Sequence, residues 1–144
     1  MVTRTGIMIA LLLSVGGSAG AQQTGAGTQL PPGHRSSTAG VYTSEQATRG
    51  AEAYAGMCTG CHTTAAHMGD VFVSNWSGRP VSEFYGFIRS AMPKNEPGSL
   101  SAEEYASIVA YILKLNGMPA GKDVLPADSI ALQKIRFDPP KKGP

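Results

Sequence analysis

The sequence predicts an all-α fold, with three main helices joined by long loops. Three stretches repeat their apolar residues with helical spacing, around residues 47–54, 81–88 and 105–115. No stretch shows the strict alternation of apolar and polar residues that is typical of a half-buried strand. A chain of 144 residues suffices for one modest domain, and we find no internal repeat.

The first helix is expected to begin near Thr43. Thr43 and Gln46 resemble a capping box, in which each side chain bonds the other residue's backbone N–H. The apolar face that follows carries Gly50 and ends at Tyr54. Glycine lowers helix propensity, so its place on this face suggests that another helix approaches closely.

The second and third helices have clear boundaries. Pro80 suits the first turn of the second helix, since its fixed φ angle fits a helix start. Ser101 and Glu104 form a second capping-box pattern, and Asn116-Gly117 is a typical helix stop. The apolar stripe of the third helix is long: Tyr105, Ile108, Val109, Ile112 and Leu115.

The N-terminus has the pattern of a secretory signal peptide, residues 1–21. Arg4 provides the positive region, residues 7–15 are apolar, and Ala19-Gly20-Ala21 fits a cleavage site after Ala21. A membrane-spanning helix needs about 20 apolar residues, so the alternative of a membrane anchor is disfavoured. We expect an exported, periplasmic protein whose mature chain has no membrane span.

Three further segments complete the predicted organisation. Residues 22–42 are rich in Gly, Ser, Thr, Gln and Pro and are expected to form a flexible arm. Residues 43–117 form the domain, in which residues 63–79 are expected to be an irregular loop. Residues 118–144 form a tail with one short helical turn around residues 126–135.

The charge balance argues against a nucleic-acid partner. The chain has 12 Lys and Arg against 10 Asp and Glu, and removing Arg4 with the signal peptide leaves 11 against 10. Nucleic-acid-binding domains are usually strongly basic.

Cys58-Thr59-Gly60-Cys61-His62 is the C-x-x-C-H pattern of haem attachment. Two thiols at this spacing can add across the two vinyl groups of haem, and the adjacent histidine can bind the iron. A thioredoxin-like dithiol would need a βαβ context, which is absent from the predicted elements. A zinc site would need more ligands in the usual pairs than these residues and His67 supply. We therefore predict one covalent haem c (heme c), with Cys58, Cys61 and His62 as its attachment residues.

The second axial ligand of the iron must come from farther along the chain. Met92 is the best candidate, because the long segment after His62 can fold over the other haem face and Pro93 keeps the following backbone out of a helix. Met118 is followed by proline too, but it comes just after the third helix. Met57 is too close to Cys58 in the chain, and Met68 too close to His62.

The other two histidines are not expected to bind iron. His67 is expected to be an exposed loop residue, because it lies too near His62 to reach the opposite haem face without strain. His34 is expected to be solvated in the arm.

Over residues 43–117 the chain resembles the class I c-type cytochromes. The resemblance consists of R-G-A-E-A-Y before C-T-G-C-H, then W-S-G-R, A-M-P, P-G-S-L-S and E-Y-A-S-I-V-A-Y-I-L. It implies the cytochrome c fold around one haem, with the first and last helices crossing near Gly50. It also implies Met92 as the distal ligand. The chain departs from the family in lacking a proline within residues 63–79, whose carbonyl would accept the N–H of the proximal imidazole.

Similar family members place a Trp and an Arg near the haem propionates, which makes Trp76 and Arg79 candidate cofactor-binding residues. An indole N–H and a guanidinium can both donate hydrogen bonds to carboxylates. Core packing of Trp76 and a solvated Arg79 remain equally open.

The resemblance implies electron transport rather than catalysis by this chain. His/Met ligation closes both axial positions of the iron, and no nucleophile–base or carboxylate pair marks an enzyme. The segment around the third helix is similar to cytochromes that serve periplasmic quinoprotein dehydrogenases. The expected partners are thus a dehydrogenase donor and an oxidase or cytochrome acceptor. Two alternatives stay open, an electron-transfer subunit of a dehydrogenase complex and a ligand-binding or sensor haem protein.

Overall fold

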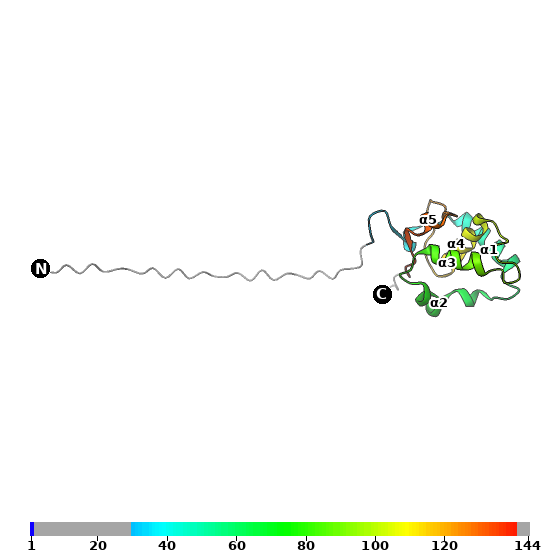
Figure 1. Ribbon diagram of the computed structural model, residues 1–144. Coiled ribbons are helices and arrows are strands. Elements are labelled where there is room, and N and C mark those ends of the chain that lie inside the picture. Colours follow the sequence, from blue (N-terminus) through cyan, green and yellow to red (C-terminus); the bar gives the residue numbers. More distant parts are fainter. Residues whose placement is uncertain (2–29, 141–144) are drawn as a thin grey trace.

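The computed structural model describes residue 1 and residues 30–140 (Figure 1). The predicted signal peptide after its first residue, residues 22–29 of the predicted arm and the last four residues lie outside this part. Five α-helices and two short 3-10 helices account for most of the regular structure that is described, with a single pair of two-residue strands. The elements are β1 (Arg35–Ser36), η1 (Ser37–Ala39), α1 (Ser44–Met57), η2 (Thr64–His67), α2 (Gly69–Trp76), α3 (Val81–Ala91), α4 (Ala102–Leu115), α5 (Ser129–Leu132) and β2 (Ile135–Arg136).

Helices α1, α3 and α4 are the three predicted main helices, so the all-α fold class is confirmed, and the arrangement is consistent with the cytochrome c fold. α1 and α4 pack together more extensively than any other pair of elements. Gly50 makes this possible, because a Cβ atom there would overlap the Ser107 carbonyl group of α4 and lie 3.0 Å from Tyr111 Cβ. The predicted close approach at Gly50 is therefore confirmed.

The two predicted capping boxes have different outcomes. At α4, Glu104 N donates to Ser101 Oγ over 3.2 Å and Ser101 N donates to Glu104 Oε2 over 2.8 Å, as expected. At α1, Gln46 N donates to Thr43 Oγ1, but the Gln46 side chain instead exchanges two hydrogen bonds with the backbone of Leu125. Gln46 is buried, and a buried amide needs both a donor and an acceptor, which the tail backbone provides.

The prediction of an irregular loop over residues 63–79 is wrong in part, because η2 and α2 lie within it. α2 lies at the edge of the molecule in Figure 1 and packs through Phe72. The Phe72 ring is edge-on to Phe84 of α3, with centroids 5.5 Å apart, and to Phe137, with centroids 6.2 Å apart. These partners are distant in sequence, so the local pattern did not predict the helix.

The chain on both sides of the predicted domain packs against it. β1 and β2 pair in parallel, with Arg35 opposite Ile135, and Ser37 Oγ both donates to Asp138 O and accepts from Asp138 N. Tyr42 is fully buried, and its hydroxyl donates to Met118 O over 2.5 Å. This packing differs from the expectation of a flexible arm through residue 42. The short helical turn expected in the tail is α5, at Ser129–Leu132.

Candidate haem-binding site

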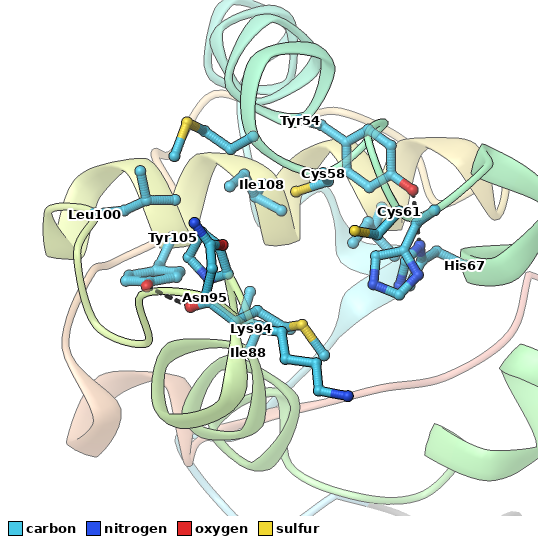
Figure 2. A pocket seen from close by; sticks show the side chains of 15 residues that line it. Tyr54, Cys58, Cys61, His67, Ile88, Lys94, Asn95, Leu100, Tyr105 and Ile108 are labelled. Atoms are coloured by element: carbon cyan, nitrogen blue, oxygen red, sulfur yellow. Dashed lines mark hydrogen bonds between the residues drawn. The ribbon is translucent and has the colours of Figure 1, made fainter.

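A cavity of about 620 Å³ opens between the end of α1, α3, α4 and the loop after α3 (Figure 2). Most of its lining is apolar, and it contains sulfur and imidazole groups from three parts of the chain. The lining residues are Tyr54, Met57, Cys58, Cys61, His62, His67, Ile88, Met92, Pro93, Lys94, Asn95, Leu100, Tyr105, Ile108 and Ile112. The cavity thus brings together all four residues predicted as haem attachment and iron-binding residues.

A tight turn at the end of α1 gathers Cys58, Cys61 and His62. Cys58 caps the helix, and its N–H donates to Tyr54 O over 2.8 Å. The Cys58 carbonyl then accepts from Cys61 N over 3.1 Å and from His62 N over 2.9 Å. Because the two cysteines are not joined in a disulfide, both thiols are free on the cavity wall.

Met92 reaches the cavity from the end of α3. Its N–H donates to Ile88 O over 2.9 Å, and its carbonyl accepts a 2.6 Å hydrogen bond from the Tyr105 hydroxyl. Figure 2 shows Tyr105 and Leu100 on the side of the cavity away from Cys61 and His67. The backbone of Met92 is therefore held on the side opposite the cysteine–histidine turn.

The remaining described methionines differ in their access to the cavity. Met118 is 2% exposed and packs in the core, outside the cavity lining. Met68 is exposed and does not line the cavity. Met57 does line it, next to Cys58, so Met57 is the other thioether in the same space.

His67 lies in the cavity wall, and the prediction of an exposed loop histidine is wrong. Its Nδ1 is 2.8 Å from the Tyr54 hydroxyl, and its ring meets that of His62 edge-on, with centroids 5.0 Å apart. The Tyr54 hydroxyl is also 3.2 Å from Thr63 O. The sequence did not reveal this position, because it depends on partners outside the loop that carries His67.

Asn116, at the end of α4, fixes the backbone of the same segment. Its Nδ2 donates to His67 O and to Ile112 O, each over 2.8 Å, and its Oδ1 accepts from Gly69 N over 3.1 Å. The sequence indicated Asn116 only as a helix stop. The structure shows that it also ties the segment after His62 to α4.

Burial favours the neutral forms of three groups in this wall, Cys58, Tyr54 and His67. It raises the pKa of the Cys58 thiol. It also raises the pKa of Tyr54, with smaller contributions from Cys58 and Tyr111. The pKa of His67 is lowered, first by burial and then by the neighbouring His62. All three shifts have the direction expected for a largely apolar site.

Trp76 and Arg79, the candidate residues for the haem propionates, do not line the cavity, and their role toward propionates stays a prediction. The Trp76 ring packs on Phe84, with centroids 4.7 Å apart, and the Arg79 guanidinium stacks 4.5 Å over Trp76. Arg79 also forms an ion pair with Glu83, one turn later. The side chains of these two residues therefore contact each other and α3. The backbone around them is held by two hydrogen bonds to the tail, from Gly78 N to Phe137 O and from Phe137 N to Arg79 O.

Three further observations concern residues outside the cavity and the described part of the chain as a whole. His34 is exposed, as predicted for a solvated histidine. Among residues 30–140, no three His, Cys, Asp or Glu side chains gather into a group that could hold a metal ion. Nor is any helix of that part long and apolar enough to cross a membrane.

The residues of the cavity fit a haem. Binding sites for small molecules and cofactors commonly have volumes of about 300–1,000 Å³ and largely apolar walls. Here two free thiols, two imidazoles and two thioethers share one such cavity, with Ile88, Leu100 and other apolar side chains around them. Cys58 and Cys61 would hold the porphyrin, and the predicted iron ligands His62 and Met92 lie in the same cavity as His67 and Met57.

The comparisons with known proteins agree with this fit. The sequence model of the family described as "Cytochrome C oxidase, cbb3-type, subunit III" matches residues 45–112, slightly less than half of the 144-residue chain. No curated protein and no solved structure matches significantly. The helical fold, the Cys58–His62 turn and the family match together support a c-type cytochrome domain over residues 45–112.

Proposed function

We propose that the chain is a periplasmic electron carrier with one covalent haem c, attached at Cys58 and Cys61 and ligated by His62 and Met92. The observation that carries the proposal is the shared cavity. Both thiols and His62 lie on one wall of it, and the Met92 backbone is held on the other side. The expected partners are a dehydrogenase as donor and an oxidase or another cytochrome as acceptor, and we propose no catalytic role for this chain alone.

The side chains suit electron transfer in three ways. Haem iron, when bound, supplies a centre that takes up and gives back one electron. Imidazole from His62 and thioether from Met92 would occupy both axial positions, which leaves no position for a substrate. Thioether is a soft ligand, and Met/His ligation raises the reduction potential. Buried apolar neighbours such as Ile108 and Ile112 give the same cavity an apolar wall.

Optical spectra of the exported protein test the ligands. Ferric haem with a methionine ligand has a weak red absorption band, which wild-type protein is expected to show. Met92→Ala should remove the band, lower the reduction potential and open the ferrous iron to carbon monoxide. Met118→Ala and Met57→Ala are the controls, one in the core and one in the cavity. Loss of the band in either control and its retention in Met92→Ala would contradict the assignment.

Covalent attachment and export have separate tests. After denaturing electrophoresis, the protein band should stain for haem, and replacing Cys58 and Cys61 by Ser should abolish the stain. Haem that extracts into acidified organic solvent would contradict covalent attachment. The mass of the periplasmic protein should correspond to a chain beginning at Gln22. A retained Met1 would contradict the proposed cleavage.

A further inference from the structure

Four tyrosines, Tyr42, Tyr54, Tyr85 and Tyr105, are each at most 1% exposed and donate a hydroxyl hydrogen bond to a backbone carbonyl. Two of them, Tyr54 and Tyr105, line the cavity, and the other two do not. The two cavity tyrosines come from the two helices that pack together most extensively, α1 and α4. Each of their hydroxyls bonds the loop that carries one predicted iron ligand.

The Tyr54 hydroxyl bonds two points of the loop after His62. It is 3.2 Å from Thr63 O and 2.8 Å from His67 Nδ1. Both bonds form together in one arrangement: the hydroxyl donates to Thr63 O, which can only accept, and the His67 tautomer with its proton on Nδ1 donates to the Tyr54 oxygen. In this arrangement the residue directly after His62 is tied to α1.

The Tyr105 hydroxyl does the same for the loop after α3. It donates to Met92 O over 2.6 Å and accepts from Gly98 N over 3.1 Å. These two bonds join both ends of a segment whose middle, residues 94–97, is exposed. Among the described residues, the Tyr105 hydroxyl is the one side-chain group that donates to the Met92 carbonyl.

We propose that Tyr54 and Tyr105 are paired positioning residues, one for each axial ligand of the iron. The inference rests on the proposed His62 and Met92 ligation. Neither hydroxyl is assigned a contact with the iron. Tyr54 holds the segment that orients His62, and Tyr105 holds the carbonyl of Met92 and so limits where its thioether can lie. Groups around a metal site orient its ligands in this way through hydrogen bonds.

The two tyrosines should have separable effects on the two ligands. Exogenous imidazole competes with a methionine ligand for ferric haem, and the loss of the red absorption band reports the exchange. Removing the Tyr105 hydroxyl frees the Met92 backbone, so imidazole should bind about two- to tenfold more tightly, the range expected for one hydrogen bond. Removing the Tyr54 hydroxyl should change this affinity by less than about twofold, because Met92 keeps its own anchor.

The experiment compares four Tyr→Phe variants of the haem-loaded protein. Tyr54→Phe and Tyr105→Phe remove the two cavity hydroxyls. Tyr42→Phe is the matched control for Tyr105, because the Tyr42 hydroxyl bonds the carbonyl of the other Met-Pro dipeptide, at Met118. Tyr85→Phe removes a buried hydroxyl that lies 3.2 Å from Ala127 O and 3.5 Å from Ala102 O and does not line the cavity. Imidazole titration and the paramagnetically shifted proton resonances of the two ligands are measured for each.

Support requires a crossed pattern. Tyr105→Phe should raise the imidazole affinity and shift the methionine methyl resonance, and Tyr54→Phe should shift the His62 ring resonances alone. The control variants should lower stability without either effect. Equal responses of Tyr105→Phe and Tyr42→Phe would overturn the inference while the proposed function stands. Absence of the red band from wild-type protein would overturn the proposed ligation and the inference with it.

Discussion

The loop that carries His62 and the loop that carries Met92 are built differently. Cys58, Cys61 and His62 follow α1 without a break, and one carbonyl, that of Cys58, accepts from both later residues. Met92 also ends a helix, but residues 94–99 of the segment that follows are exposed, and the chain packs on the core again at Leu100, just before α4. Its fixed points are the helix end, the Tyr105 hydroxyl and the cap at Ser101.

The two predicted ligands are therefore positioned by different kinds of contact, local for the histidine and long-range for the methionine. The histidine belongs to a five-residue motif whose own backbone hydrogen bonds, to Cys58 O, form a tight turn. The methionine is fixed by contacts with a helix that begins ten residues later, at Ala102. We therefore expect changes to the histidine loop to act through attachment and ligation, and changes to the methionine loop to act through the position of the ligand.

The largest expected effect is that of His62→Ala. It removes the only imidazole of the attachment motif, so the low-spin haem spectrum should be lost. His67→Ala should retain low-spin haem but shift the His62 resonances, because the two rings are in edge contact. His34→Ala should change nothing, since His34 is exposed. Optical and proton magnetic resonance spectra of the three variants check this order, and an unchanged spectrum for His62→Ala would contradict the assignment.

Gly50→Ala should act on both loops at once, because α1 leads into the histidine loop and α4 carries Tyr105. The new methyl group would overlap the Ser107 carbonyl, which is backbone and cannot rotate away. We expect the free energy of unfolding to fall by about 3 kcal/mol, at the upper end for overpacking.

Gly56→Ala, in the same helix, is the matched control. A Cβ atom there meets nothing within 4 Å, so stability should rise by up to about 1 kcal/mol through better helix propensity. Guanidinium unfolding of both variants measures the difference. Similar values for the two would mean that the close approach at Gly50 does not determine the packing of α1 on α4.

The sequence predicted those parts of the molecule whose causes are local. The capping box at Ser101, the helix stop at Gly117 and the buried face of α3 each follow from residues within a few positions. The attachment turn is predictable for the same reason. Met92 could be proposed because its loop is long, but only the Tyr105 bond shows what holds it.

The parts that the sequence did not reveal depend on distant partners. β1 has two residues, too few to show the alternating apolar and polar pattern of a strand, and its partner β2 lies about a hundred positions later. Gln46 fits a capping box, but the buried backbone of Leu125 competes for its side chain. His67 likewise depends on distant partners. Tyr54 bonds its imidazole ring, and Asn116 bonds its backbone carbonyl.

Asn116→Ala should affect the histidine loop and leave the methionine loop unchanged. It removes the donor to His67 O and the acceptor for Gly69 N, and we expect a loss of about 2 kcal/mol in unfolding free energy. The His62 ring resonances should shift, and the methionine methyl resonance should stay.

Asn116→Asp sharpens the test of Asn116. The carboxylate can still accept from Gly69 N, but it cannot donate to His67 O or Ile112 O and would face both carbonyls. The Asp variant should therefore be no more stable than the Ala variant at neutral pH. An Asp variant with the unfolding free energy of the wild-type protein would show that the amide donor does not hold this loop.

The smallest expected effect is that of Ser101→Ala, at the far end of the methionine loop. Loss of the hydroxyl that accepts from Glu104 N should lower the unfolding free energy by about 1 kcal/mol.

The Ser101 backbone N–H, and then its hydroxyl, lower the pKa of Glu104 from its usual 4.5. A carboxylate with a lowered pKa stabilises the folded state above its unfolded pKa, and this contribution disappears as the pH falls through the lowered value. Ser101→Ala should therefore weaken the acid dependence of unfolding between these two pKa values, and Glu104→Gln should remove that part of it. Guanidinium unfolding of both variants, measured from neutral pH to below pH 4.5, tests the cap. An unchanged acid dependence in Glu104→Gln would mean that the box contributes nothing to anchoring the methionine loop at α4.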